Sequence, residues 1–131
     1  MYELTVISGF SAAHSLRGYE GECERLHGHN WRVEVTVVAD RLDDIGLAID
    51  FKVLKAELEK VLEGLDHHCL NDIPPFDTEN PSSESIARFI FLKLSNALSS
   101  PGIGGIRVKK VKVWESEIAA AAYLEEWRVE S

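Results

Sequence analysis

Apolar and polar residues alternate in two segments near the start of the chain. Residues 2–12 are rich in β-branched and aromatic side chains, and every second residue over 31–37 is apolar. These patterns are typical of strands, and the period of two over 31–37 indicates a half-buried one. The stretch between them, 13–28, carries three glycines among charged residues without a sustained period. It is predicted to be a long loop, and long loops in small domains are usually functional.

In the middle of the chain the apolar residues recur with the spacing of a helix. Asp50 is a suitable N-cap for a first helix that ends near Gly64. After a polar loop that contains three prolines, Ser82 or Ser83 can cap a second helix. The predicted apolar stripes are Phe51, Leu54, Leu58, Val61, Leu62 and Leu65 in the first helix, and Ile86, Phe89, Ile90, Leu94 and Ala97 in the second.

Two more strands, about 106–115 and about 120–129, follow a turn-rich break at 101–105. The order strand, strand, helix, helix, strand, strand predicts an α+β fold. Strands adjacent in sequence tend to pair antiparallel, and both helices would cover one face of the sheet. The length of 131 residues predicts a single domain over 1–131. If the other face of the sheet is apolar, it needs cover, which favours assembly.

The charge balance restricts the partners of the chain. Fourteen basic and 22 acidic residues give a net charge of −8, which argues against nucleic acid or an anionic membrane as the main partner. No apolar run approaches the ~18 residues of a spanning helix, and the first residues lack the features of a signal peptide. Cys23 and Cys69 suggest no disulfide framework. We therefore expect a soluble, cytoplasmic protein.

Three of the five histidines fall between residues 14 and 29. On an extended chain His27 and His29 project from the same face, and His14, just after the first strand, can complete a three-ligand set. Three neutral imidazoles suit zinc and leave a fourth position for water or substrate. An isolated His-x-His pair is more often two exposed polar residues. Gly28, Cys23 and the glycine-rich loop favour the metal, so the pattern predicts a catalytic zinc site.

Cys23 and Glu24 precede this pair by a few residues. Cys23 could be a fourth ligand, which would close the site and suit a non-catalytic, zinc-stabilised assembly protein. It could instead be a thiolate base or nucleophile beside the metal, or a small buried side chain. Glu24 could serve as an acid or base, or be a solvated loop carboxylate.

Two other places carry candidate chemistry. Asp66 and His67 follow the first predicted helix, where the aspartate could orient the imidazole or share a proton with it. A histidine favoured by the helix dipole is the alternative. Glu115, at the end of the third long strand, could accept two hydrogen bonds from an amidine-like edge, or be a surface glutamate.

Taken together, these motifs resemble the 6-pyruvoyl tetrahydropterin synthase family, which includes the bacterial 6-carboxytetrahydropterin synthases of queuosine biosynthesis. The resemblance runs from about residue 3 to about residue 127. It is carried by six ordered motifs, namely Phe10–His14, Cys23–Asn30, Ile49–Phe51, Leu65–Asp72, Glu79–Glu84 and Val113–Glu115.

The resemblance implies a tunnelling fold (T-fold), a four-stranded antiparallel sheet with two helices on one face. It also implies homohexamers built from two stacked trimers, with active sites between subunits. The site roles that it implies are zinc ligation by His14, His27 and His29, proton transfer by Cys23, Asp66 and His67, and anchoring of the pterin by Glu115.

The implied substrate is 7,8-dihydroneopterin triphosphate, which loses triphosphate and acetaldehyde to give 6-carboxy-5,6,7,8-tetrahydropterin. The carboxy-forming enzymes carry a Cys-x-x-x-His-Gly-His pattern, which Cys23 satisfies. A folate-pathway subgroup carries Glu-x-x-His-Gly-His, which Glu24 satisfies. Side-chain cleavage to 6-hydroxymethyl-7,8-dihydropterin, a dual activity, and 6-pyruvoyl tetrahydropterin synthesis are therefore the alternatives. Arg17 and Arg25 are nearby cations in the sequence for the triphosphate.

Overall fold

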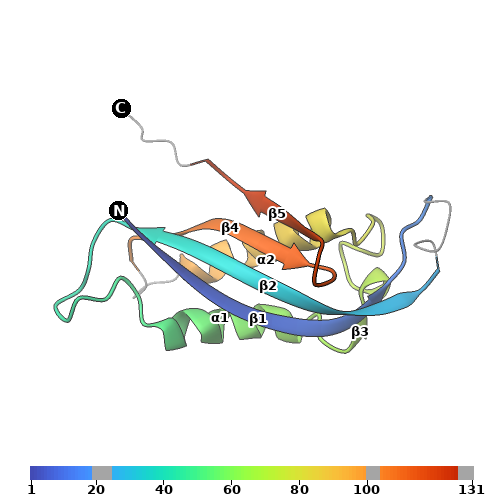
Figure 1. The fold of residues 1–131 in the computed structure, drawn as a ribbon, viewed down its shortest axis with the longest axis horizontal. Coiled ribbons are helices and arrows are strands. Elements are labelled where there is room, and N and C mark those ends of the chain that lie inside the picture. The colour runs from blue at the N-terminus through green and yellow to red at the C-terminus, as the bar shows by residue number, and fades with distance from the viewer. Residues whose placement is uncertain (19–24, 100–103, 127–131) are drawn as a thin grey trace.

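The chain forms a twisted sheet whose long strands run antiparallel (Figure 1). The computed structural model describes residues 1–18, 25–99 and 104–126. Strands β1 (Tyr2–His14) and β2 (His27–Ala39) pair along their whole length. Strand β4 (Ile106–Trp114) pairs with the other edge of β2, and β5 (Ala120–Leu124) pairs with β4. The four predicted strands are thus all present.

A fifth, two-residue strand makes the sheet mixed rather than purely antiparallel. Strand β3 (His68–Cys69) runs parallel to the end of β1, beside Ala12 and Ala13, and a short 3-10 helix, η2 (Leu70–Asp72), follows it. The strand order is β3-β1-β2-β4-β5. The predicted four-stranded antiparallel sheet is wrong in this respect, because two residues are too few to produce a periodic pattern.

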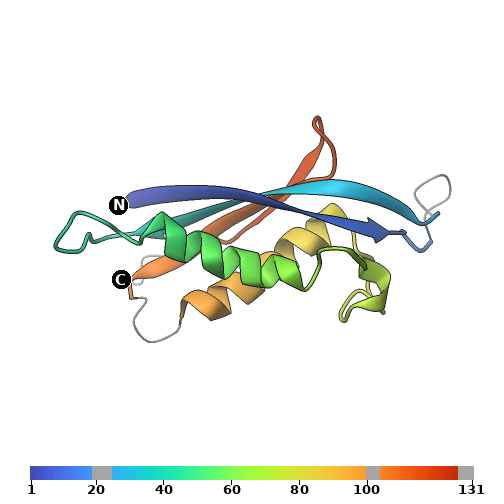
Figure 2. The same ribbon diagram turned by 90° about the horizontal axis from the view of Figure 1, so that it is seen from below.

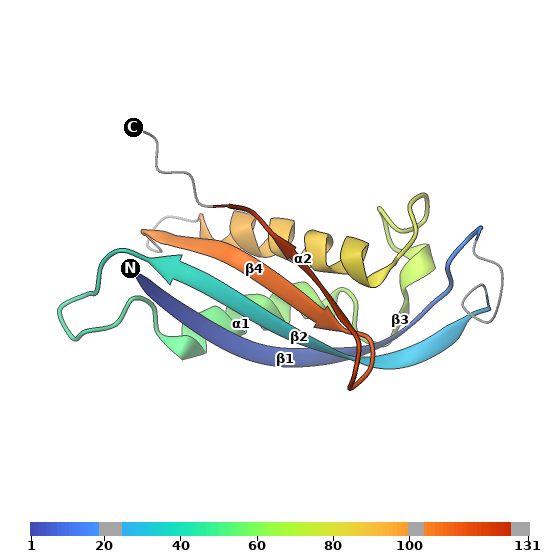
Figure 3. The same cartoon turned by 45° about the horizontal axis from the view of Figure 1, so that its top comes forward.

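Both helices lie on the same side of the sheet, as Figure 2 and Figure 3 show. In α1 (Phe51–Glu63), the Asp50 carboxylate accepts a hydrogen bond from the Lys52 N–H, and Gly64 is the C-cap. In α2 (Ser83–Leu98), the Ser82 side chain accepts a hydrogen bond from the Ser85 N–H. Each cap satisfies an N–H group that has no partner within the helix. The two helices and their predicted N-caps are confirmed.

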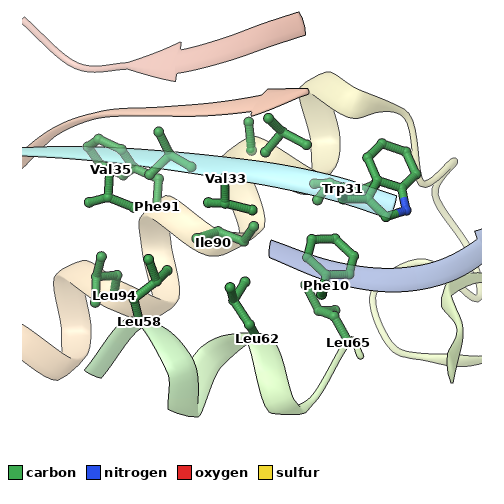
Figure 4. Packing of buried hydrophobic residues seen from close by; sticks show 14 of the residues in the cluster. Phe10, Trp31, Val33, Val35, Leu58, Leu62, Leu65, Ile90, Phe91 and Leu94 are labelled. Carbon is green, nitrogen blue, oxygen red and sulfur yellow. The ribbon is translucent and has the colours of Figure 1, made fainter. Parts of the chain in front are cut away.

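The core lies between the helices and the inward face of the sheet (Figure 4). Alternate residues of β2, such as Val33 and Val35, are fully buried against the leucine and isoleucine stripes of the helices. Burial of each such side chain contributes roughly 1.5–3 kcal/mol. At one end of this core Phe10 stacks on Trp31 with ring centroids 5.8 Å apart. The strand ends beyond these rings are therefore supported by packed aromatic side chains.

Strands β1 and β2 extend farther than the residue pattern predicts. The ladder between them continues to the pair His14 and His27, so part of the predicted loop 13–28 belongs to the strands. Backbone pairing across the hairpin places these residues in the sheet although His-Gly-His is not a strand-forming sequence. At the other terminus β5 ends at Leu124, earlier than predicted, and the expected strand beyond residue 126 lies outside the described residues.

The face of the sheet away from the helices is polar along β2. Asn30, Arg32, Glu34 and Thr36 occupy it, and Arg32 forms an ion pair with Glu34 at 3.2 Å. From Asn30 to Thr36 this face is therefore not the apolar face that would need cover. Among the described residues, neither helix has the length and apolar character needed to cross a membrane.

Candidate metal centre

Three histidines converge where β1 ends and β2 begins. His14 is the last residue of β1 and faces inward after Phe10 and Ala12, while His27 and His29 alternate inward with Trp31. The register pairs His14 with His27 and Ala12 with His29, so the three imidazoles share one face of the ladder. The structure thus brings together the three histidines that the spacing selects.

A carboxylate joins the three imidazoles. Glu115 directly follows β4, whose last residue, Trp114, pairs with Arg32 of β2. Its Oε1 lies 3.2 Å from Nε2 of His14 and 3.1 Å from Nε2 of His29. One ligand atom from each of the four side chains lies within 4.8 Å of the others. Sequence reasoning missed that Glu115 lies in this cluster, because the neighbourhood depends on the pairing of β4 with β2.

The donor set fits a divalent metal ion. The Nε2 of His14 lies 3.0 Å from the Nε2 of His27, and imidazole nitrogens and a carboxylate oxygen are typical zinc ligands. The Nε2 of His29 is buried and makes no hydrogen bond, and its nearest charged neighbour is Glu115 Oε1 at 3.1 Å. Burial lowers the pKa of His29, while Glu115 acts in the opposite direction. A neutral, unpaired imidazole nitrogen is the form that a metal requires.

Backbone carbonyls orient two of the imidazoles through their other nitrogen. Nδ1 of His14 lies 2.7 Å from the carbonyl oxygen of Pro81, and Nδ1 of His27 lies 2.7 Å from that of Arg25. A carbonyl can only accept, so each Nδ1 carries the proton and each Nε2 keeps a lone pair toward the cluster. The Trp31 ring contacts His14 and His29 edge to face, at centroid distances of 4.9 and 5.2 Å.

Asp66 and His67 form a separate pair at the outer edge of β1. Asp66 Oδ1 accepts a 2.8 Å hydrogen bond from the Ser11 N–H, and Oδ2 lies 2.9 Å from His67 Nδ1. The Ser11 N–H, followed by His67, holds the pKa of Asp66 below its ordinary value. His67 has a φ of 58°, which is unusual for a residue other than glycine. Its N–H donates to the Ser11 carbonyl, and its side chain is 81% exposed.

Within the parts of the chain that the structure describes, no hydrogen bond or ion pair connects Asp66 or His67 with the histidine cluster. Cys23 and Glu24 lie outside the described residues. Arg17, one of the nearby cations in the sequence, donates its guanidinium hydrogens to the carbonyls of Asn71, Phe76 and Glu79. A triphosphate would have to compete with these three carbonyls for the guanidinium of Arg17.

Comparison with known proteins identifies relatives of the chain. The family model described as 6-pyruvoyl tetrahydropterin synthase matches residues 3–126. A 6-carboxy-5,6,7,8-tetrahydropterin synthase of Synechocystis is 44% identical over 119 residues, covering 87% of this chain and 86% of that protein. A dihydroneopterin monophosphate aldolase of Pyrococcus furiosus is 33% identical over 108 residues, covering 82% and 84%.

A solved structure has the same fold. The 6-pyruvoyl tetrahydropterin synthase of Caenorhabditis elegans superimposes with a TM-score of 0.83 at 28% identity, covering 95% of this chain and 96% of that one. The expected T-fold is thereby confirmed, with β3 as an addition to the four long strands. On the match over residues 3–126 and the 44% identity, the chain belongs to the 6-pyruvoyl tetrahydropterin synthase family.

Proposed function

We propose that the chain is a zinc-dependent lyase that converts 7,8-dihydroneopterin triphosphate into 6-carboxy-5,6,7,8-tetrahydropterin. The reaction takes up water and releases triphosphate and acetaldehyde. The observation that carries the proposal is the cluster of three imidazoles and a carboxylate with an unpaired, buried Nε2 at His29. The 44% identity with the Synechocystis 6-carboxy-5,6,7,8-tetrahydropterin synthase supports this choice of product.

In this proposal His14, His27 and His29 hold the zinc ion through their Nε2 atoms. Zinc, when bound, supplies Lewis-acid polarisation of the substrate's side-chain oxygens, which acidifies the neighbouring C–H groups. The carbonyls of Pro81 and Arg25 keep two of the imidazoles in the tautomer that can ligate.

We assign the proton transfers to Cys23, Asp66 and His67. Cys23 acts as the base in its thiolate form, because the thiolate and not the thiol is the reactive form of a cysteine. Asp66, which the Ser11 N–H helps to keep ionised, orients the His67 imidazole through the 2.9 Å contact at Nδ1. His67 then relays protons through Nε2. Glu24 remains a second candidate acid or base.

Glu115 is proposed to anchor the pterin. Its carboxylate can accept hydrogen bonds from the 2-amino group and N3–H of the ring, and this two-point contact would orient the side chain of the substrate toward the histidines. Its side chain is 34% exposed and therefore accessible to a ligand. The alternative is that Glu115 completes the metal coordination, which its distances to His14 and His29 also permit.

The proposed assembly is a homohexamer made of two trimers. Within the described residues the outer edge of β1 pairs with another strand only at Ala12 and Ala13, and β5 has no strand on its outer side. Unpaired edges are ready to accept strands from other copies. Among the described residues no hydrogen bond or ion pair joins the Asp66–His67 pair to the histidine cluster of its own chain, which supports sites that are completed between subunits.

A second candidate is cleavage of the pterin side chain to 6-hydroxymethyl-7,8-dihydropterin, alone or as a dual activity. Two observations favour it: Glu24 satisfies the Glu-x-x-His-Gly-His pattern, and the Pyrococcus relative is named as an aldolase. Formation of 6-pyruvoyl tetrahydropterin is the third alternative and is suggested by the name of the Caenorhabditis protein.

Chromatographic identification of the pterin product tests these proposals. The zinc-loaded protein is incubated with 7,8-dihydroneopterin triphosphate, and acetaldehyde is measured in parallel. We expect 6-carboxy-5,6,7,8-tetrahydropterin and acetaldehyde in equal amounts. A 6-hydroxymethyl product that is lost in Glu24→Ala would favour the second candidate. Absence of any turnover by zinc-loaded protein would support the non-catalytic, zinc-stabilised alternative.

A further inference from the structure

The segment that follows His14 lies against the connection between η2 and α2. In an extended chain the N–H and C=O of residues i and i+2 point to the same edge. Ser15 and Arg17 are related in this way, and each is paired with the side chain of an asparagine, Ser15 with Asn71 of η2 and Arg17 with Asn80 of the connection. The two asparagines therefore occupy the place that a neighbouring strand would take.

The two pairings have the same geometry. Asn71 Oδ1 accepts from the Ser15 N–H at 2.9 Å, and its Nδ2 donates to the Ser15 carbonyl at 3.0 Å. In the same way Asn80 Oδ1 accepts from the Arg17 N–H at 2.9 Å, and Asn80 Nδ2 donates to the Arg17 carbonyl at 2.9 Å. A side-chain amide carries one acceptor and two donors, so it can replace a peptide group in such a ladder. Alanine or aspartate at these positions could make at most part of this pairing.

The side chain of Arg17 returns to the same connection. Its guanidinium donates to the carbonyl of Phe76 at 2.8 Å, that of Glu79 at 3.2 Å and that of Asn71 at 3.4 Å. Arg17, Asn71 and Asn80, here called the polar clamp, thus join residues 15–17 to residues 71–80.

The clamp ends one residue before the carbonyl that orients His14. Asn80 is followed by Pro81, whose ring restricts φ, and Pro81 is followed by Ser82, the N-cap of α2. With Asn80 fixed on one side and Ser82 on the other, the Pro81 carbonyl has little freedom. It lies 2.7 Å from Nδ1 of His14. In a neutral imidazole this hydrogen bond selects the tautomer whose Nε2 lone pair is directed to the cluster.

We propose that Asn80, supported by Asn71 and Arg17, is a positioning residue for the metal ligand His14. It acts through the Pro81 carbonyl and sets both the tautomer and the orientation of the imidazole. This inference rests on the proposed role of the three histidines as zinc ligands. The connection before α2 then positions a metal ligand in addition to linking η2 to α2.

The test compares Asn80→Ala with Asp43→Ala. Asp43 is the matched control, because its side chain likewise makes two hydrogen bonds to the backbone, both accepted by Oδ1 from the N–H groups of Ile45 and Leu47, in the loop beyond the far end of β2. Zinc affinity is measured by competition with a chromophoric chelator. The tautomer of His14 is read from ¹⁵N imidazole NMR spectra of the metal-free protein at alkaline pH. Thermal unfolding of the metal-free variants measures the purely structural cost.

We expect Asn80→Ala to bind zinc several-fold more weakly than the unmodified chain, but by less than the roughly 10–100-fold that is usual when the orienting partner itself is lost, because the Pro81 carbonyl remains. His14 should change from a single Nδ1–H tautomer to a mixture. Asp43→Ala should keep the zinc affinity and the tautomer. Asn80→Asp keeps the acceptor and removes the donor, and it serves as a milder second variant with the same expected direction if Asn80→Ala does not fold.

Unchanged zinc affinity and an unchanged tautomer in Asn80→Ala would overturn the inference and leave the clamp as a loop attachment. Failure of the proposed function is a different result. If the unmodified, zinc-loaded protein does not turn over the pterin, the affinity and tautomer measurements still decide the role of Asn80. If the unmodified protein binds no zinc, the tautomer of His14 in the metal-free variants decides it.

Discussion

Glu115 Oε1 lies 3.1 Å from Nε2 of His29, although both helices separate the two residues in the sequence. The pairing of β4 with β2 creates this contact, since Trp114 is the register partner of Arg32. The carboxylate therefore stands next to the candidate ligands. Its role, as pterin anchor or as a fourth ligand, determines whether a coordination position stays open for substrate.

Glu115→Gln separates these two roles. If Glu115 anchors the pterin, the glutamine keeps the shape of the side chain but offers one oxygen as a hydrogen-bond acceptor, where the carboxylate offers two. A lost hydrogen bond to a charged group corresponds to roughly 1.5–3 kcal/mol, or roughly 10–100-fold in kcat/KM, with zinc content unchanged. Steady-state kinetics and metal analysis measure both quantities. Glu34→Gln, on the polar face of β2, is the control. A Glu115→Gln protein that has lost its zinc would identify Glu115 as a ligand.

The buried Nε2 of His29 leads to a prediction about stability. If the proposed zinc ion binds the folded state and not the unfolded chain, free zinc at 100 times the Kd should add roughly 2.7 kcal/mol to the free energy of unfolding and raise Tm by roughly 10 °C. In His29→Ala the zinc-dependent rise should disappear. Differential scanning calorimetry with and without zinc measures it. His68→Ala, which removes an exposed histidine outside the cluster, should respond like the unmodified chain.

The hydrogen bond from the Ser11 N–H to Asp66 predicts a pH dependence. The pKa of Asp66 is lowered in the folded state, so the ionised carboxylate stabilises the fold above the unfolded pKa of about 3.9. This contribution is lost as the pH falls through the folded pKa. Asp66→Asn should therefore destabilise the metal-free protein most near neutral pH, and the difference should shrink in acid.

Urea unfolding of metal-free Asp66→Asn and of the unmodified chain at several pH values measures this difference. Asp72→Asn, an exposed carboxylate nearby, is the control and should show a much smaller difference. If the destabilisation by Asp66→Asn were independent of pH, the carboxylate would not be the group that Ser11 stabilises.

The same variant tests the proton relay, since a role for His67 requires a fall in kcat with little change in KM.

Cys23→Ala tests the base that the proposal assigns. We expect no formation of 6-carboxy-5,6,7,8-tetrahydropterin by this variant, while its zinc content stays equal to that of the unmodified chain. Metal analysis and product chromatography are both needed. Cys69→Ala, which removes the half-buried thiol of β3, should retain the activity. Loss of zinc in Cys23→Ala would show that the thiolate is a ligand rather than a base.

The local parts of the fold are predictable from the sequence, and the reason is visible in particular residues. Asp50 and Ser82 cap the two helices as expected, because capping depends on a side chain and an N–H two or three residues away. The alternation that begins at Trp31 defines the inward face of β2 and, continued backwards, places His29 and His27 on it. Spacing alone therefore groups His27 with His29, whereas His14 joins them through the pairing of β1 with β2.

Features that depend on long-range pairing were not predictable. The ladder extends β2 back to His27 because β1 continues opposite it, and β3 forms only because the chain after α1 returns to Ala12. The approach of Glu115 to the cluster and the contact of Pro81 with His14 likewise join segments far apart in the sequence. The asparagines that hold the latter contact lie in two of the recognised motifs, but their partners become apparent only in three dimensions.

Metal-dependent turnover tests the central claim most directly. Metal-free protein is titrated with zinc while triphosphate release from 7,8-dihydroneopterin triphosphate is followed. We predict that the rate rises from near zero and saturates at an equimolar amount of zinc, and that His29→Ala gives no such rise. Triphosphate release by the metal-free protein at the same rate as by the zinc-loaded protein would contradict a catalytic zinc ion held by His14, His27 and His29.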